Sequence, residues 1–91
     1  MTFTVIYNWG WVKHEDCRNA YSIHLSDCKI AQAAEVNENK NKIQGYTDNL
    51  PTLEAAIADA EDDATCRFGE TLRNYGFKQM VKICKCAKVG A

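Results

Sequence analysis

The sequence predicts one compact α+β domain over residues 1–91, in which a small antiparallel sheet of about four or five strands packs on one long α-helix. Two patterns lead to this prediction. Apolar residues alternate along the N-terminal segment, and an apolar stripe with helical spacing follows residue 50. A chain of 91 residues fits one hydrophobic core better than two, and its 46% hydrophobic content excludes general disorder.

The first predicted strand is Thr2–Val12. Aromatic and β-branched side chains occupy every second position of it and therefore share one face: Phe3, Val5, Tyr7, Trp9 and Trp11. After a polar loop at His14–Asn19, Ala20–Leu25 is predicted to form a second strand.

The segment Cys28–Val36 allows two interpretations. Its alanine, glutamine and glutamate residues favour a helix that Ser26 or Asp27 would cap. The polar run Asn37–Asn41 that follows is typical of a hairpin loop instead. We favour strand, loop and strand, with Lys42–Tyr46 as the returning strand.

The clearest pattern predicts a long helix that begins near Pro51 or Thr52 and ends at Gly76. Its apolar residues are spaced by three or four positions and form one stripe: Leu53, Ile57, Ala60, Ala64, Phe68, Leu72 and Tyr75. Gly69 costs the helix about 1 kcal/mol relative to alanine, and we expect it to allow a close approach to the sheet.

The last segment, Phe77–Val89, also allows two interpretations. Phe77, Met80, Val81 and Cys84 have helical spacing. The break at Gly76 and the β-branched residues favour a strand, which we prefer.

Charge is distributed unevenly along the chain. Eleven Lys and Arg against twelve Asp and Glu give a net charge of -1, which disfavours a strongly basic nucleic-acid binder and an acidic DNA mimic. Thr52–Thr65 nevertheless holds five acidic residues and no basic one, while Phe77–Ala91 holds four lysines and no acidic residue. The lysines would contact an anionic partner, or they would only protect a sheet edge from aggregation.

Exposed tryptophans are typical interface anchors, although an aromatic stripe in a strand is more often core. We therefore expect a partner-binding surface built from lysines and two tryptophans. The candidate residues are Lys78, Lys82, Lys85, Lys88, Lys40, Lys42, Trp9 and Trp11.

Cysteine usage bears on compartment and on metal binding. Five cysteines, an odd number, and no visible signal peptide favour reduced thiols in the cytoplasm, with Cys66 buried in the helix as a small apolar side chain. His14 and Cys17 are three positions apart, Cys84 and Cys86 are two apart, and Cys28 or His24 could join them. Because the paired spacing typical of structural zinc sites is missing, we expect no metal and no cofactor.

Catalytic motifs are also missing from the sequence. The five glycines are scattered and form no phosphate-binding loop. Cys17 and His14 could in principle form a nucleophile and base, but this pair has no further support. We therefore expect no enzymatic activity and no small-molecule substrate. We also expect no membrane-spanning segment, because no apolar run is long enough to cross a bilayer.

In layout, the chain resembles the small anti-CRISPR proteins of phages. The resemblance covers the whole chain but no family motif: an aromatic first strand (TFTVIYNWGWV), an acidic helix (TLEAAIADAEDDATCRF) and a final lysine-bearing segment (KQMVKICKCAKV). It implies a non-catalytic inhibitor in the host bacterial cytoplasm. Such a protein would dock on a CRISPR-Cas effector complex, contact protein carboxylates or guide RNA, and block target DNA binding. The alternative is a small nucleic-acid-binding module that uses the lysine-rich C-terminal segment.

Overall fold

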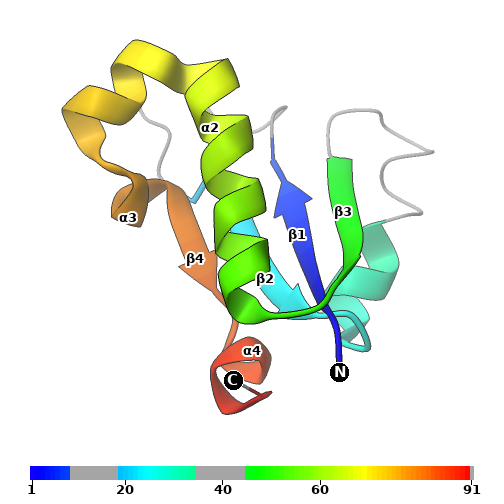
Figure 1. The fold of residues 1–91 in the computed structure, drawn as a ribbon. Coiled ribbons are helices and arrows are strands. Elements are labelled where there is room, and N and C mark those ends of the chain that lie inside the picture. Colours follow the sequence, from blue (N-terminus) through cyan, green and yellow to red (C-terminus); the bar gives the residue numbers. More distant parts are fainter. Residues whose placement is uncertain (9–18, 35–44, 91) are drawn as a thin grey trace.

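The computed structural model of the protein describes residues 1–8, 19–34 and 45–90. Its four described strands are β1 (Phe3–Tyr7), β2 (Tyr21–Leu25), β3 (Gly45–Leu50) and β4 (Val81–Ile83). They form one sheet in the order β3-β1-β2-β4 (Figure 1). The predicted α+β class with a small sheet is confirmed.

The sheet is mixed, so the prediction of an antiparallel sheet is wrong in part. β1 is antiparallel to both β2 and β3, whereas β2 and β4 are parallel. A parallel pair needs a long connection between its strands. The chain provides one here, since β3 and the long helix lie between β2 and β4 in the sequence.

The long helix α2 (Leu53–Tyr75) begins and ends as the sequence predicts. Thr52 is its N-cap, and the Thr52 hydroxyl accepts a hydrogen bond from the amide of Ala55 at 3.0 Å. Gly76 ends the helix with φ 80° and ψ 147°, a conformation that favours glycine. Gly69 has non-helical angles, so α2 is kinked and is not one continuous straight helix.

One face of α2 packs on the sheet through small side chains. Ala56, Ala60 and Ala64 are completely buried, and Phe68 continues the same face. Leu53, Ile57 and Leu72 of the predicted stripe are partly buried against this core. The predicted apolar stripe does not include Ala56, which the structure places on the same buried face. Because alanine has a short side chain, the helix backbone approaches the sheet closely.

The sheet is covered on both faces. All five residues of β1 are buried, which the alternating pattern alone does not require. Phe3, Val5 and Tyr7 belong to the core cluster shared with α2, as predicted. Thr4 and Ile6 are also buried although they point to the opposite face, so the second face of the sheet is covered as well.

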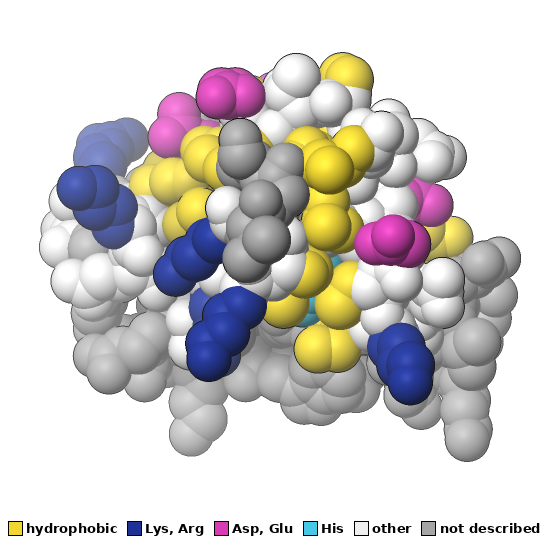
Figure 2. Space-filling model, turned by 90° about the horizontal axis from the view of Figure 1, so that it is seen from below, with side chains coloured by type: hydrophobic (Ala, Val, Ile, Leu, Met, Phe, Trp, Pro, Cys, Tyr) yellow, Lys and Arg dark blue, Asp and Glu magenta, His cyan; other side chains and the backbone are white. Residues whose placement is uncertain are grey.

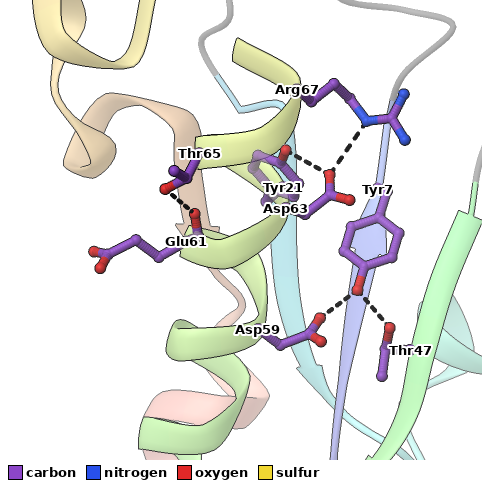
Figure 3. Close-up of polar contacts among 8 residues, drawn as sticks. All are labelled: Tyr7, Tyr21, Thr47, Asp59, Glu61, Asp63, Thr65 and Arg67. Atoms are coloured by element: carbon purple, nitrogen blue, oxygen red, sulfur yellow. Dashed lines mark hydrogen bonds and ion pairs between the residues drawn. The ribbon is translucent and has the colours of Figure 1, made fainter. Parts of the chain in front are cut away.

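Two tyrosines join the sheet to α2 through hydrogen bonds (Figure 3). The Tyr21 hydroxyl donates to Asp63 at 2.7 Å, and Asp63 also accepts from Arg67 at 3.3 Å. The Tyr7 hydroxyl contacts both Asp59 of α2 and Thr47 of β3. The acidic residues of α2 therefore do not all face solvent, because Asp59 and Asp63 accept hydrogen bonds from the two core tyrosines.

The segment after β2 is helical, so our preference for a strand over Cys28–Val36 is wrong for its described part. Residues 29–34 form a short helix, and the amide of Gln32 donates to the carbonyl of Cys28 at 3.0 Å. Ala31 and Ala34 are buried while the residues between them are exposed, which is helical spacing. The helical propensity of this segment decides its structure.

The C-terminal segment is only in part a strand, which corrects the prediction over Phe77–Val89. It forms α3 (Phe77–Met80), then β4, then α4 (Lys85–Gly90). Met80 and Ala87 are completely buried and hold the two short helices against the core. In the part of the chain that the structure describes, no helix is long and apolar enough to cross a membrane.

Candidate functional site

A cluster of three cysteines and one histidine lies where β2 and β4 end. His24 is in β2, Cys28 follows the turn after β2, and Cys84 and Cys86 lie at the junction of β4 and α4. One ligand atom from each side chain can be chosen so that all four lie within 4.8 Å of one another. Residues distant in the sequence thus bring four potential metal donors together.

The spacing of these atoms is close to that of a coordinated metal ion. Four donors in a tetrahedron around zinc, with zinc–sulfur bonds of about 2.3 Å, lie roughly 3.8 Å from one another. The Cys28 sulfur and the His24 Nδ1 atom are 3.8 Å apart. The four donors could therefore surround one ion with only small side-chain movements.

The backbone of β2 positions the cysteines. The amide of Cys84 donates to the carbonyl of Ile23 at 2.9 Å, and the amide of Cys28 donates to the carbonyl of Leu25 at 3.0 Å. The Leu25 amide donates in turn to the Cys86 sulfur at 3.4 Å. All three cysteines are thus fixed against the same end of β2, beside His24.

The His24 ring is oriented by a hydrogen-bonding partner on each nitrogen. Its Nδ1 atom faces the Cys28 sulfur, and its Nε2 atom lies 3.1 Å from the Ser22 hydroxyl. Burial, together with the positive charge of Lys82, lowers the pKa of His24 below its ordinary value. The neutral ring that results can donate a lone pair from Nδ1 while Nε2–H bonds to Ser22.

The two thiols at the β4–α4 junction have different environments. The backbone amide of Cys86 donates to Cys84 and lowers the pKa of the Cys84 thiol. Burial raises the pKa of the Cys86 thiol. Cys66, in contrast, is exposed on α2, so the prediction that it is buried is wrong.

A hollow of about 710 Å³ adjoins this cluster, and lysines surround it. The residues that line the hollow include Ser22, His24, Ile30, Lys82, Cys84, Lys85 and Lys88. The three lysines are exposed, and Ile30 is 57% exposed. Seen from below, side chains of the hydrophobic class gather around a partly visible histidine, and lysine or arginine side chains lie to either side (Figure 2).

The structure brings together only part of the predicted binding surface. Lys82, Lys85 and Lys88 share the hollow, whereas on the predicted strand Lys85 would face away from the other two. Lys78 lies on α3 and does not line this hollow. The other predicted contacts lie outside the described residues: Lys40, Lys42, Trp9 and Trp11.

The sequence offers all four cluster residues as candidate ligands, although their spacing led us to expect no metal. The pair Cys84 and Cys86 was visible as C-x-C, and His24 and Cys28 form an H-x3-C pair. Neither spacing is the usual zinc knuckle, so the folded position of the second pair was the missing information. His14 and Cys17, the other candidate pair, lie outside the described residues.

In comparisons with known proteins, no family model, curated protein or solved structure matches the chain. The donor cluster and the lysines beside it are therefore the features from which we infer a function.

Proposed function

We propose that the protein is a non-catalytic binding protein and that the lysine-lined hollow contacts an acidic surface of a partner protein. The observation that supports this proposal best is the convergence of Lys82, Lys85 and Lys88 around one hollow. Among the residues that the structure describes, none that lines this hollow is acidic, which supports contacts between its lysines and a partner's carboxylates.

The same hollow offers an apolar contact. Ile30 is a large side chain that is more than half exposed, and it lines the same hollow as the lysines. Interfaces combine an apolar centre with polar groups at the rim, and this hollow offers side chains of both kinds. The hollow therefore suits a protein surface that presents carboxylates around a small hydrophobic group.

Charge elsewhere favours a protein partner over a nucleic acid. Helix α2 carries exposed acidic residues, among them Glu54, Glu61 and Glu70, and the net charge of the chain is -1. A long polyanion would be repelled by such residues wherever it passed near them, whereas a local acidic patch would meet only the lysines.

The resemblance to small anti-CRISPR proteins gives the first partner to test. We propose that the partner is a CRISPR-Cas effector complex and that binding blocks its access to target DNA. Inhibition of this kind requires only a stable complex, which agrees with a surface made of lysines and apolar side chains.

The experiment compares charge reversals inside and outside the hollow. Full-length protein and its Lys82→Glu/Lys85→Glu variant are titrated against purified effector complexes, with Lys78→Glu as a single charge reversal outside the hollow. We expect the double variant to bind at least about tenfold more weakly, since a close charge pair across an interface contributes about 1.5 kcal/mol or more. Lys78→Glu should bind like the unchanged protein.

Two results would argue against the proposal. If Lys82→Glu/Lys85→Glu and Lys78→Glu bound the partner with equal affinity, the hollow would not be part of the interface. Binding to a bare single-stranded RNA or DNA oligonucleotide, with an affinity that falls steeply as salt rises, would favour the nucleic-acid-binding module instead.

A further inference from the structure

We propose that His24, Cys28, Cys84 and Cys86 bind one zinc ion in a closed tetrahedral site. This inference is independent of the partner proposed above, because it rests on the donor atoms alone. Three thiols and an imidazole lie within 4.8 Å of one another, and the His24 nitrogen and Cys28 sulfur are already at the separation expected of two zinc ligands.

The donor set selects the metal. Three thiolate sulfurs and one imidazole nitrogen are soft to intermediate ligands, and hard cations such as Mg²⁺ and Ca²⁺ prefer oxygen ligands. Cysteine and histidine in a four-ligand set are characteristic of structural zinc. Among the described residues, no carboxylate belongs to the cluster.

Hydrogen bonds from neighbouring groups already orient two of the four donor side chains, His24 and Cys86. His24 presents Nδ1 to the cluster while its Nε2 atom bonds to Ser22, and such a partner fixes the ring of a metal-bound histidine. The Cys86 sulfur accepts the Leu25 amide, which is a backbone hydrogen bond of the kind that supports a thiolate. The ligands are thus oriented by groups outside the cluster.

Four protein ligands leave no open coordination position, so the inferred role is structural. The ion would connect the end of β2 and the turn at Cys28 to the junction of β4 and α4. α4 has only six residues, and of the side chains described in it only Ala87 is completely buried. A zinc ion at its first turn would hold this helix and its lysines in place.

The charge balance agrees with the neighbouring lysines. Zinc binding to three thiols and neutral His24 releases three protons and leaves a centre with one net negative charge. Lys82, Lys85 and Lys88 line the adjoining hollow and would stabilise that charge. The lysines together exceed the charge of the centre, so the hollow stays positive for an acidic partner.

The test is a metal titration of the full chain. The protein is stripped of metal with a chelator under reducing conditions and titrated with Zn²⁺ and, separately, with Co²⁺. We expect one ion per chain, and a Co²⁺ spectrum with tetrahedral d–d bands and strong thiolate-to-cobalt charge transfer. The unchanged protein is used, so this measurement does not depend on whether a variant folds.

Variants then assign the ligands. Cys84→Ser should weaken zinc binding by more than about 100-fold, while Cys66→Ser, which changes an exposed cysteine outside the cluster, should leave it unchanged. Ser22→Ala keeps all four ligands and should weaken binding by about tenfold through loss of the bond to His24.

The proposal is overturned if the unchanged chain takes up neither metal, or if bound Co²⁺ shows no thiolate charge transfer. It is also overturned if Cys84→Ser and Cys66→Ser bind zinc equally well. If Cys17→Ser abolishes binding while Cys84→Ser does not, the metal is held by other residues and the assignment to this cluster is wrong.

Discussion

The side chain of Tyr21 shows how single polar groups hold α2 on the sheet. Its ring is completely buried between the ring of Tyr7, 5.7 Å away between centroids, and the ring of Phe68, 6.2 Å away. Both contacts are edge-to-face, which aromatic pairs favour. The hydroxyl still reaches Asp63 at 2.7 Å, and burial together with this carboxylate raises the pKa of Tyr21 above its ordinary value.

Removing that hydroxyl tests its contribution. We expect Tyr21→Phe to lower the free energy of unfolding by roughly 1–2 kcal/mol, because a hydrogen bond to a charged group is lost while the ring packing remains. Asp63 keeps its ion pair with Arg67, which limits the loss. Urea denaturation measures the change, and an unaltered midpoint would show that the bond does not stabilise the fold. In a double-mutant cycle with Asp63→Asn, strictly additive effects would show that the two groups do not interact.

At the level of single residues, the sequence offers the four side chains of the cluster but does not predict that they meet. Local spacing places Cys84 beside Cys86, and it identifies the lysines that follow Gly76. No local rule places His24 and Cys28 against that pair, because the contact depends on β4 lying parallel to β2. The missing information is a pairing of distant strands, which propensity and periodicity do not contain.

Among the elements, α2 is the best predicted, and it packs on the sheet through small side chains. The order of cap, apolar stripe and terminal glycine is local, so the sequence alone is enough to recognise it. Its contact with the sheet depends on the three alanines that face the core. Larger side chains at these positions would separate the helix from the strands.

Substitutions on opposite faces of α2 test this packing. Ala60→Leu adds volume where the alanine is completely buried, and we expect it to lower the free energy of unfolding by about 1–3 kcal/mol. Ala58→Leu makes the same change on the exposed face and should change the free energy of unfolding by no more than about 0.5 kcal/mol. Chemical denaturation of both variants gives the comparison. Equal losses would contradict the close contact between α2 and the sheet.

The two segments that the sequence left ambiguous carry three of the four proposed ligands, Cys28, Cys84 and Cys86. Residues 29–34 and the chain from Phe77 onward mix helical and strand signals, and each forms short elements. Short elements depend on tertiary contacts more than on propensity. A metal ion at their junction would supply contacts that the small core of this region does not.

At the scale of the whole molecule, three lysines and the four proposed metal ligands lie near one end of the sheet. The lysine-lined hollow and the cysteine–histidine cluster share His24 and Cys84 as lining residues. The zinc ion we infer would therefore shape the surface that we propose to be the binding site. Loss of metal would disturb the lysines even though none of them is a ligand.

X-ray absorption spectroscopy of the zinc-loaded full chain tests this account most directly, because it reads the ligands of the ion itself. The account predicts three sulfur neighbours at about 2.3 Å and one nitrogen neighbour at about 2.0 Å. A first shell made only of nitrogen and oxygen atoms would contradict it, since the three cysteines at the end of β2 would then not hold the metal.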